Sequence, residues 1–207
     1  NKHIKRKVIW MNFLDSIKSK ISNKKISDKV VLDMEEITER EIASIINSLD
    51  LKDDDDFFSN LYNTLQVHEY LVLNNEHIED GGKFEKEAIY KAIVVKTATS
   101  ASNAFEFKTI LDKIGIPSEI YLFSACHYAV LVLLGSEYYI FDPTWDRDKY
   151  AMEGEESYNP TFVAMGKNIY ERVYTPEKSL PINTSEESVS KRKIKEMMGA
   201  KCKRLTK

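Results

Sequence analysis

The chain has 207 residues, of which 43% are hydrophobic and 30% are charged, and its net charge is −3. This length suits one domain, or one domain with appendages, and allows a sizeable core. The nearly balanced charge gives no reason to expect a general attraction to nucleic acid or to a membrane surface. No apolar run is long enough to span a bilayer, and no signal peptide is recognisable. The chain begins with Asn1 instead of Met, so an upstream segment is an expectation and the compartment stays open.

Cysteine and glycine usage argues against a disulfide framework and against common ligand sites. Cys126 and Cys202 are the only cysteines, which is too few for a disulfide scaffold. No Cys/His cluster has zinc spacing, and no Gly-rich loop has the pattern that cradles phosphate. We therefore expect no metal, no cofactor and no nucleotide.

The N-terminal third is predicted to be helical. Apolar residues recur at helical spacing over 8–21. Thr38 followed by Glu41 predicts a capping box that opens a second helix. The four consecutive aspartates at 53–56 cannot all converge on one cation, and they predict a solvated acidic loop. The apolar stripe of the second helix consists of Ile42, Ile45, Ile46 and Leu49.

A third helix is expected over 58–74, with His68 on its apolar side. A histidine in such a place is more often a packed residue with one hydrogen bond than a catalytic group, and we interpret it so. Residues 79–82 contain two glycines and predict a turn. The stretch 84–95 leaves a short helix and an extended segment as alternatives.

The segment 97–114 predicts a helix with a distinctive beginning. Its start is small and hydroxyl-rich, which makes Thr99 or Ser100 the expected N-cap, and Gly115 with Pro117 ends the helix. A side chain at this start lies at the positive end of the helix dipole, a position that stabilises a thiolate or an oxyanion.

The stretch 119–141 predicts three strands, the last two joined as a hairpin. The turn is Gly135-Ser136, between apolar runs at 129–134 and 138–141. His127 and Asp142 lie almost equidistant from this turn, so they should be neighbours in an antiparallel pair. A carboxylate that holds one imidazole nitrogen leaves the other able to act as a base.

These residues together resemble a known family. A small-residue helix start, Ala104 and Phe107 as A-x-x-F, G-I-P, His127 and then D-P-T-W from Asp142 are similar to the bacterial transglutaminase-like core of the papain-like cysteine peptidase superfamily. The resemblance spans about 62–145. It implies an α+β fold in which a central nucleophile helix packs on an antiparallel sheet of three or more strands beneath a helical N-terminal layer. It also implies a site at Ser100, His127 and Asp142 that acts on peptide or carboxamide bonds without a cofactor.

The chain departs from the family pattern at the nucleophile. Ser100 stands where the family has its cysteine, and Cys126 cannot replace that cysteine because it precedes His127 on a strand and points to the opposite face. Three explanations stay open: a pseudoenzyme that keeps the scaffold for binding, an engineered Cys→Ser substitution, and a working Ser-His-Asp triad. Further departures, at positions where the family has Gly, an aromatic residue and Trp, favour natural drift; they are Ser102, Asn103 and Ala129.

We divide the chain into a helical N-terminal layer (1–57), a transglutaminase-like core (58–182) and a basic C-terminal tail (183–207). The tail can form a short helix with one apolar stripe at Ile194, Met197 and Met198, and a solvated helix is favoured. Without interleaved aromatic residues we expect no nucleic-acid binding. The partner expected is a peptide or protein, held either as substrate or by a non-catalytic binding module. The oligomeric state stays open. Ordinary structural roles for Ser100, His127 and Asp142 are the plainest alternative, and their joint spacing argues against it.

Overall fold

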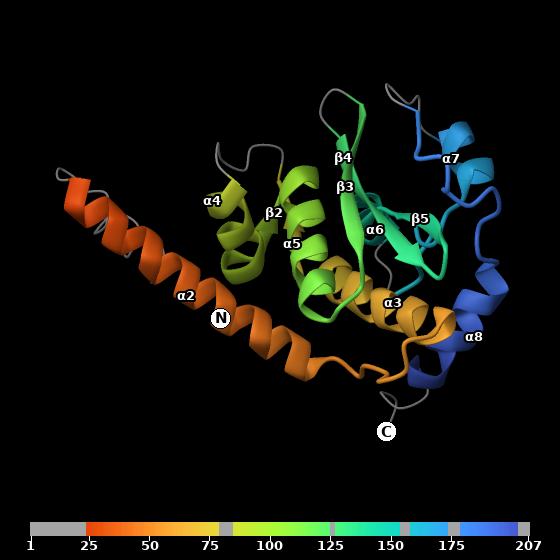
Figure 1. The fold of residues 1–207 in the computed structure, drawn as a ribbon, viewed down its shortest axis with the longest axis horizontal. Coiled ribbons are helices and arrows are strands. Elements are labelled where there is room, and N and C mark those ends of the chain that lie inside the picture. Colours follow the sequence, from red (N-terminus) through yellow and green to blue (C-terminus); the bar gives the residue numbers. More distant parts are fainter. Residues whose placement is uncertain (1–23, 79–84, 125–126, 154–157, 174–178, 203–207) are drawn as a thin grey trace.

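The computed structural model describes residues 24–78, 85–124, 127–153, 158–173 and 179–202 (Figure 1). Along the chain, the elements are α2 (Lys24–Ser48), α3 (Phe57–Asn74), β1 (Glu76–His77), α4 (Glu85–Tyr90), the π-helical turn η1 (Lys91–Val95), β2 (Thr97–Ala98), α5 (Ser100–Lys113), β3 (Ser118–Ser124), β4 (His127–Leu134), β5 (Glu137–Phe141), α6 (Pro143–Glu153), α7 (Lys167–Val173) and α8 (Lys191–Cys202).

The fold is α+β, as the sequence predicts. Strands β3, β4 and β5 form an antiparallel sheet with β4 in the middle. Helix α5 lies along β3 and β4, α2 runs past the outer side of α4 and α5, and α8 lies at the far end of α3 (Figure 1). Among the described helices, none is long and apolar enough to cross a membrane.

One hydrophobic cluster joins the helices to the sheet. It takes in Ile42 of α2, Leu65 of α3, Phe107 of α5, Val132 of β4 and Ile194 of α8, all 4% exposed or less. Side chains of β4 alternate between the two faces of the sheet, so its other residues contribute to a second cluster. Burial of this apolar surface is the main force that holds α5 on the sheet.

The chain order explains why the start of α5 and the start of β4 meet. Helix α5 leads through a short turn into β3, which runs back beside it, and β4 then runs antiparallel to β3. The first reversal returns the chain, at the end of β3, to the end of the sheet where α5 began, and β4 starts there after the second reversal. His127, the first residue of β4, therefore lies at the same end of the molecule as Ser100, the first residue of α5 (Figure 1).

A short parallel pairing fixes the segment that leads into α5. Glu76 pairs with Thr97 and His77 pairs with Ala98, so β1 and β2 tie the end of α3 to the start of α5. The residue before β2, Lys96, has φ +62° and ends the π-helical turn in the left-handed region. Residues 85–95 are helical throughout, so the helical alternative for that stretch is the correct one.

The predicted capping box at Thr38 is wrong. Thr38 lies in the middle of α2, where its Oγ1 donates to the Met34 carbonyl at 2.7 Å, an interaction that a helix interior accommodates. The apolar stripe is nevertheless confirmed, because Ile42 and Ile45 are buried against the core. The predicted helix at 8–21 and the predicted turn at 79–82 lie outside the described residues.

The acidic run forms an exposed loop, as predicted, and its last residue has a structural role. Asp56 caps α3, with its carboxylate accepting the backbone N–H groups of Phe58 and Ser59 at 2.8 Å. Those hydrogen bonds lower the pKa of Asp56. The cap explains why α3 begins at Phe57.

The C-terminal helix is not the solvated extension that the sequence favoured. Ile194 is 4% exposed and belongs to the main cluster, with Met197 and Met198 packed at its margin. In the segment before α8, Thr184 forms an isolated β-bridge with Tyr138 of β5. Lys191, Arg192 and Lys195 are exposed while the stripe docks on α3, because a single row of apolar side chains suffices to anchor a short helix.

Replacing Ile194 with alanine should therefore destabilise the protein by about 2 to 4 kcal/mol, through lost burial and the cavity that remains. Chemical denaturation measures this loss. Lys195→Ala, on the exposed side of the same helix, is the matched control and should change the free energy of unfolding by less than about 0.5 kcal/mol. Equal effects of the two substitutions would mean that α8 does not dock in solution.

Candidate active site

His127 and Asp142 form a close, largely buried pair. The Nε2 atom of His127 lies 2.6 Å from Oδ2 of Asp142. The histidine side chain is 15% exposed and the aspartate side chain is fully buried. The carboxylate thus orients the imidazole through Nε2, and acid–base chemistry by this ring would use Nδ1.

The strand register explains the contact. Val130 pairs with Phe141, so the next residues along, Ala129 and Asp142, stand opposite each other. His127 is two residues beyond Ala129 and shares its face of the sheet, which makes it the diagonal neighbour of Asp142. The neighbourhood predicted from the hairpin is confirmed, with the pair diagonal instead of directly opposed.

Asp142 has a second role as the start of a helix. Its Oδ1 accepts the backbone N–H of Trp145 at 3.0 Å, and its carbonyl accepts that of Asp146 at 3.3 Å. Pro143 follows as the first residue of α6, the place where proline best suits a helix. The two carboxylate oxygens are therefore divided between α6 and His127, which fixes the carboxylate in one orientation.

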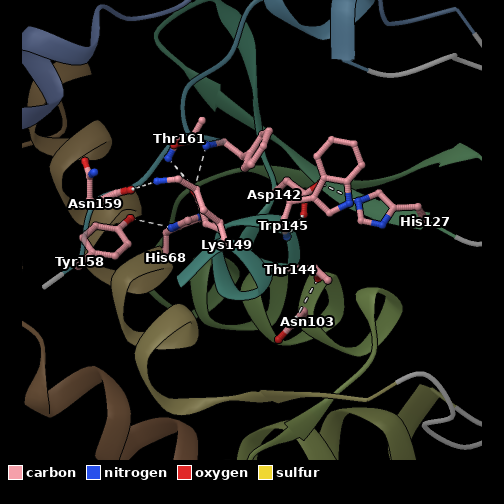
Figure 2. Close-up of polar contacts among 12 residues, drawn as sticks. His68, Asn103, His127, Asp142, Thr144, Trp145, Lys149, Tyr158, Asn159 and Thr161 are labelled. Atoms are coloured by element: carbon pink, nitrogen blue, oxygen red, sulfur yellow. Dashed lines mark hydrogen bonds and ion pairs between the residues drawn. The ribbon is translucent and has the colours of Figure 1, made fainter. Parts of the chain in front are cut away.

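Two aromatic rings pack at this place, Trp145 against the His127 ring and Phe162 against Trp145. The Trp145 ring lies beside the His127 ring with centroids 5.1 Å apart, and Phe162 meets Trp145 edge-on at 5.1 Å. Figure 2 shows the Trp145 and His127 rings side by side next to Asp142. This apolar packing limits the access of water to the His127–Asp142 hydrogen bond, which strengthens the bond.

Ser100 lies at the beginning of α5, as predicted. Thr99 is the N-cap: its Oγ1 accepts the backbone N–H of Ser102, and the Ser102 hydroxyl accepts that of Thr99. Ser100 is thus the first helical residue, 9% exposed, at the positive end of the helix dipole. A hydrogen bond between the Ser100 hydroxyl and His127 stays a prediction. Cys126 lies outside the described residues.

His68 has the packed role that the sequence favoured. Its Nδ1 lies 2.7 Å from the Tyr158 hydroxyl, and its Nε2 lies 3.5 Å from Asp146 Oδ2 (Figure 2). Burial lowers the pKa of His68, partly opposed by the Asp142 carbonyl, so the ring is neutral. Burial also raises the pKa of Asp146, whose carboxyl group accepts the N–H groups of Thr161 and Phe162. The contact between His68 and Asp146 thus links α3 to α6.

A second buried polar group lies on the inner side of α5. Asn75 donates from Nδ2 to Glu106 Oε2 at 2.6 Å and to Asn103 Oδ1 at 2.9 Å. Burial raises the pKa of the Glu106 carboxyl to about 7, opposed by Lys96 and by the Asn75 amide. Burial lowers the pKa of Lys96, whose ammonium group lies 4.9 Å from the centre of the Tyr70 ring.

The supporting roles of Asp146 and Asn103 were not predicted from the sequence. Asp146 follows D-P-T-W directly, and Asn103 follows Ser100 by three positions, so their places beside the predicted site were the available signals. Within the described parts of the chain, no group of three or more His, Cys, Asp or Glu side chains could hold a metal ion. The His127–Asp142 pair has the geometry that proton transfer through His127 Nδ1 requires.

Comparisons with known proteins return only distant structural likenesses. No protein-family model matches the chain, and neither does any curated protein. A crystal structure of a candidate cysteine protease from Cytophaga hutchinsonii matches at TM-score 0.41 and 15% identity, over 52% of this chain and 37% of that one. A TGase structure matches at TM-score 0.40 and 11% identity, over 70% of this chain and 39% of that one. The matches span well under half of each neighbour, and at these scores they assign neither a family nor an activity.

The buried carboxyl of Glu106 should give the protein a distinctive pH dependence. Its pKa is about 7 in the folded protein against 4.5 ordinarily, so between these values the folded state keeps a proton that the unfolded chain releases. This contribution to stability is complete below pH 4.5 and is lost as the pH rises to 7. Glu106→Gln should remove it, so the variant should gain stability relative to the parent across that window, by at most about 1.4 kcal/mol per pH unit.

Denaturant unfolding at half-unit steps of pH measures the difference. The exposed Glu76→Gln serves as the control and should track the parent at every pH. A constant offset between Glu106→Gln and the parent would contradict the raised pKa.

Proposed function

We propose that the chain carries a transglutaminase-like site in which Ser100 occupies the nucleophile position, His127 is the acid–base group and Asp142 orients it. The reaction class is hydrolysis or acyl transfer at a peptide or carboxamide bond. The observation that supports this best is the 2.6 Å contact between His127 Nε2 and Asp142 Oδ2, at the end of the sheet where α5 begins.

With a cysteine at position 100, the chemistry follows from the geometry. The thiolate attacks the carbonyl carbon of the substrate, the carbon–nitrogen bond breaks, and His127 gives its Nδ1 proton to the leaving amine. The resulting thioester is then attacked by water or by a second amine, which His127 deprotonates; the carbon–sulfur bond breaks, the acid or new amide leaves, and the thiolate–imidazolium pair is restored. Asp142 holds the ring throughout. The positive end of the α5 dipole stabilises the negative charge of a thiolate at position 100.

The serine itself supports a second candidate function. A hydroxyl is a far weaker acid than a thiol, so a site that works through a thiolate–imidazolium pair does not run on serine unchanged. A binding module that holds an extended peptide on the same surface, without chemistry, is consistent with Ser100 as the natural residue. A substituted natural cysteine and a Ser-His-Asp triad remain the other two explanations of that residue.

Restoring the thiol distinguishes a competent site from a binding module. In a Ser100→Cys protein from which Cys126 and Cys202 have been removed, the introduced thiol should have a pKa well below that of free cysteine, because it gains both the helix N-terminus and His127. Alkylation by iodoacetamide, followed against pH, should then persist in mildly acidic buffer.

The variants of the pair provide the controls. His127→Ala should abolish the acid-side reactivity, and Asp142→Ala should reduce it by about tenfold or more through misorientation of the imidazole. His77→Ala removes a histidine paired with Asp148 at 2.7 Å and should change nothing. A thiol that titrates like free cysteine and ignores His127 would favour the binding module. An acyl-trapping peptide probe, applied to the parent and to Ser100→Cys, tests directly for chemistry at Ser100.

A further inference from the structure

An unusual polar contact crosses between α5 and α6. Asn103 is 1% exposed, and its Nδ2 donates to Oγ1 of Thr144 at 3.1 Å (Figure 2). Thr144 is also 1% exposed. Buried side chains at helix–helix contacts are usually apolar, so a polar pair here has a cost in desolvation that an apolar pair would not have.

The position of this contact relates it to the site. Asn103 follows Ser100 by three residues in α5, so the two share one side of the helix a single turn apart. Thr144 is the second residue of α6, whose first turn is capped by Asp142. The Asn103–Thr144 bond therefore joins the turn of α5 that carries Ser100 to the turn of α6 that Asp142 caps.

Asn75 fixes the orientation of the Asn103 amide. Its Nδ2 donates to Asn103 Oδ1 at 2.9 Å, which leaves the Asn103 nitrogen directed toward Thr144. Asn75 is itself held on three sides. Its backbone N–H caps α3 at Leu71, its carbonyl accepts a hydrogen bond from Arg147 of α6, and its amide donates to Glu106.

We propose that Asn103 is a positioning residue, which sets the distance between the start of α5 and the His127–Asp142 pair through its bond to Thr144. The catalytic part of this inference rests on the proposed function, whereas the effect on the geometry of the pair does not. Loss of the bond leaves buried polar atoms unsatisfied and frees the first turn of α6, which carries Trp145 and is capped by Asp142, to shift.

The test needs a control variant of similar stability loss whose substituted residue lies away from the site. Asn63 provides it: this asparagine is 6% exposed and its amide makes two hydrogen bonds, with the backbone N–H and carbonyl of Lys52. Asn103→Ala and Asn63→Ala each remove a buried amide that bridges two segments. Thr144→Val removes the acceptor with little change of shape, in case Asn103→Ala folds poorly, and Thr144→Ser restores it.

The first readout is independent of any activity. In protein labelled with 15N-histidine, the ring proton in the His127–Asp142 hydrogen bond is assigned by its loss in His127→Gln, and its exchange with water is measured by NMR. Asn103→Ala and Thr144→Val should each accelerate exchange by about tenfold or more. Asn63→Ala and Thr144→Ser should stay within about twofold of the parent. Unchanged exchange in Asn103→Ala and Thr144→Val, or equal acceleration in Asn63→Ala, would overturn the proposal.

The second readout separates this inference from the proposed function. In the Ser100→Cys background, Asn103→Ala and Thr144→Val should lower the acid-side alkylation rate by about tenfold, and Asn63→Ala should not. If the introduced thiol is not activated in the parent, the proposed function fails, and the exchange measurement alone decides the positioning role. If the thiol is activated and Asn103→Ala leaves both readouts unchanged, the function stands and the positioning role is wrong.

Discussion

The carboxylate of Asp142 is the group on which the rest of the site depends. One oxygen holds Nε2 of His127 and the other caps the first turn of α6, while the backbone N–H of the same residue is bonded to the Phe162 carbonyl at 2.8 Å. Strand β5, helix α6 and the segment through Phe162 thus meet at one residue. A carboxylate bound on both oxygens cannot rotate away from the imidazole without uncapping a helix, so the orientation of His127 is built into the fold.

This double role bears on the meaning of the serine at position 100. Loss of a nucleophile removes any selection on chemistry, but Asp142 would still cap α6 and the aromatic rings of Trp145 and Phe162 would still pack. The pair therefore has a structural reason to be kept whether or not it serves an activity. For the same reason its presence alone does not separate an enzyme from a binding module, and the reactivity of a thiol at position 100 is the more discriminating property.

The inner side of α5 buries polar side chains that cost stability and that specify how the neighbouring elements are arranged. A helix packed between α3 and a sheet would be expected to bury apolar residues alone, as Phe107, Ile110 and Leu111 do. Asn103 and Glu106 are buried on the same helix, within hydrogen-bonding reach of Asn75. Polar groups in such a place are costly and directional, so they specify one arrangement of neighbouring elements in a way that apolar contacts do not. Departures from local rules of this kind cluster at functional sites.

The sequence by itself determined the helix of Ser100, the hairpin and the approach of His127 to Asp142, because each depends on residues close together in the chain. Helical spacing, a hydroxyl-rich start and a Gly-Ser turn are local signals, and the two site residues lie fifteen positions apart. Only the tertiary structure decided that α8 docks through Ile194 and that Asn103 meets Thr144. These outcomes depend on which buried surfaces meet, over separations of 41 residues for Asn103 and Thr144 and 90 for His68 and Tyr158. No local pattern encodes a partner so distant, because that choice is made by the free energy of packing the whole core.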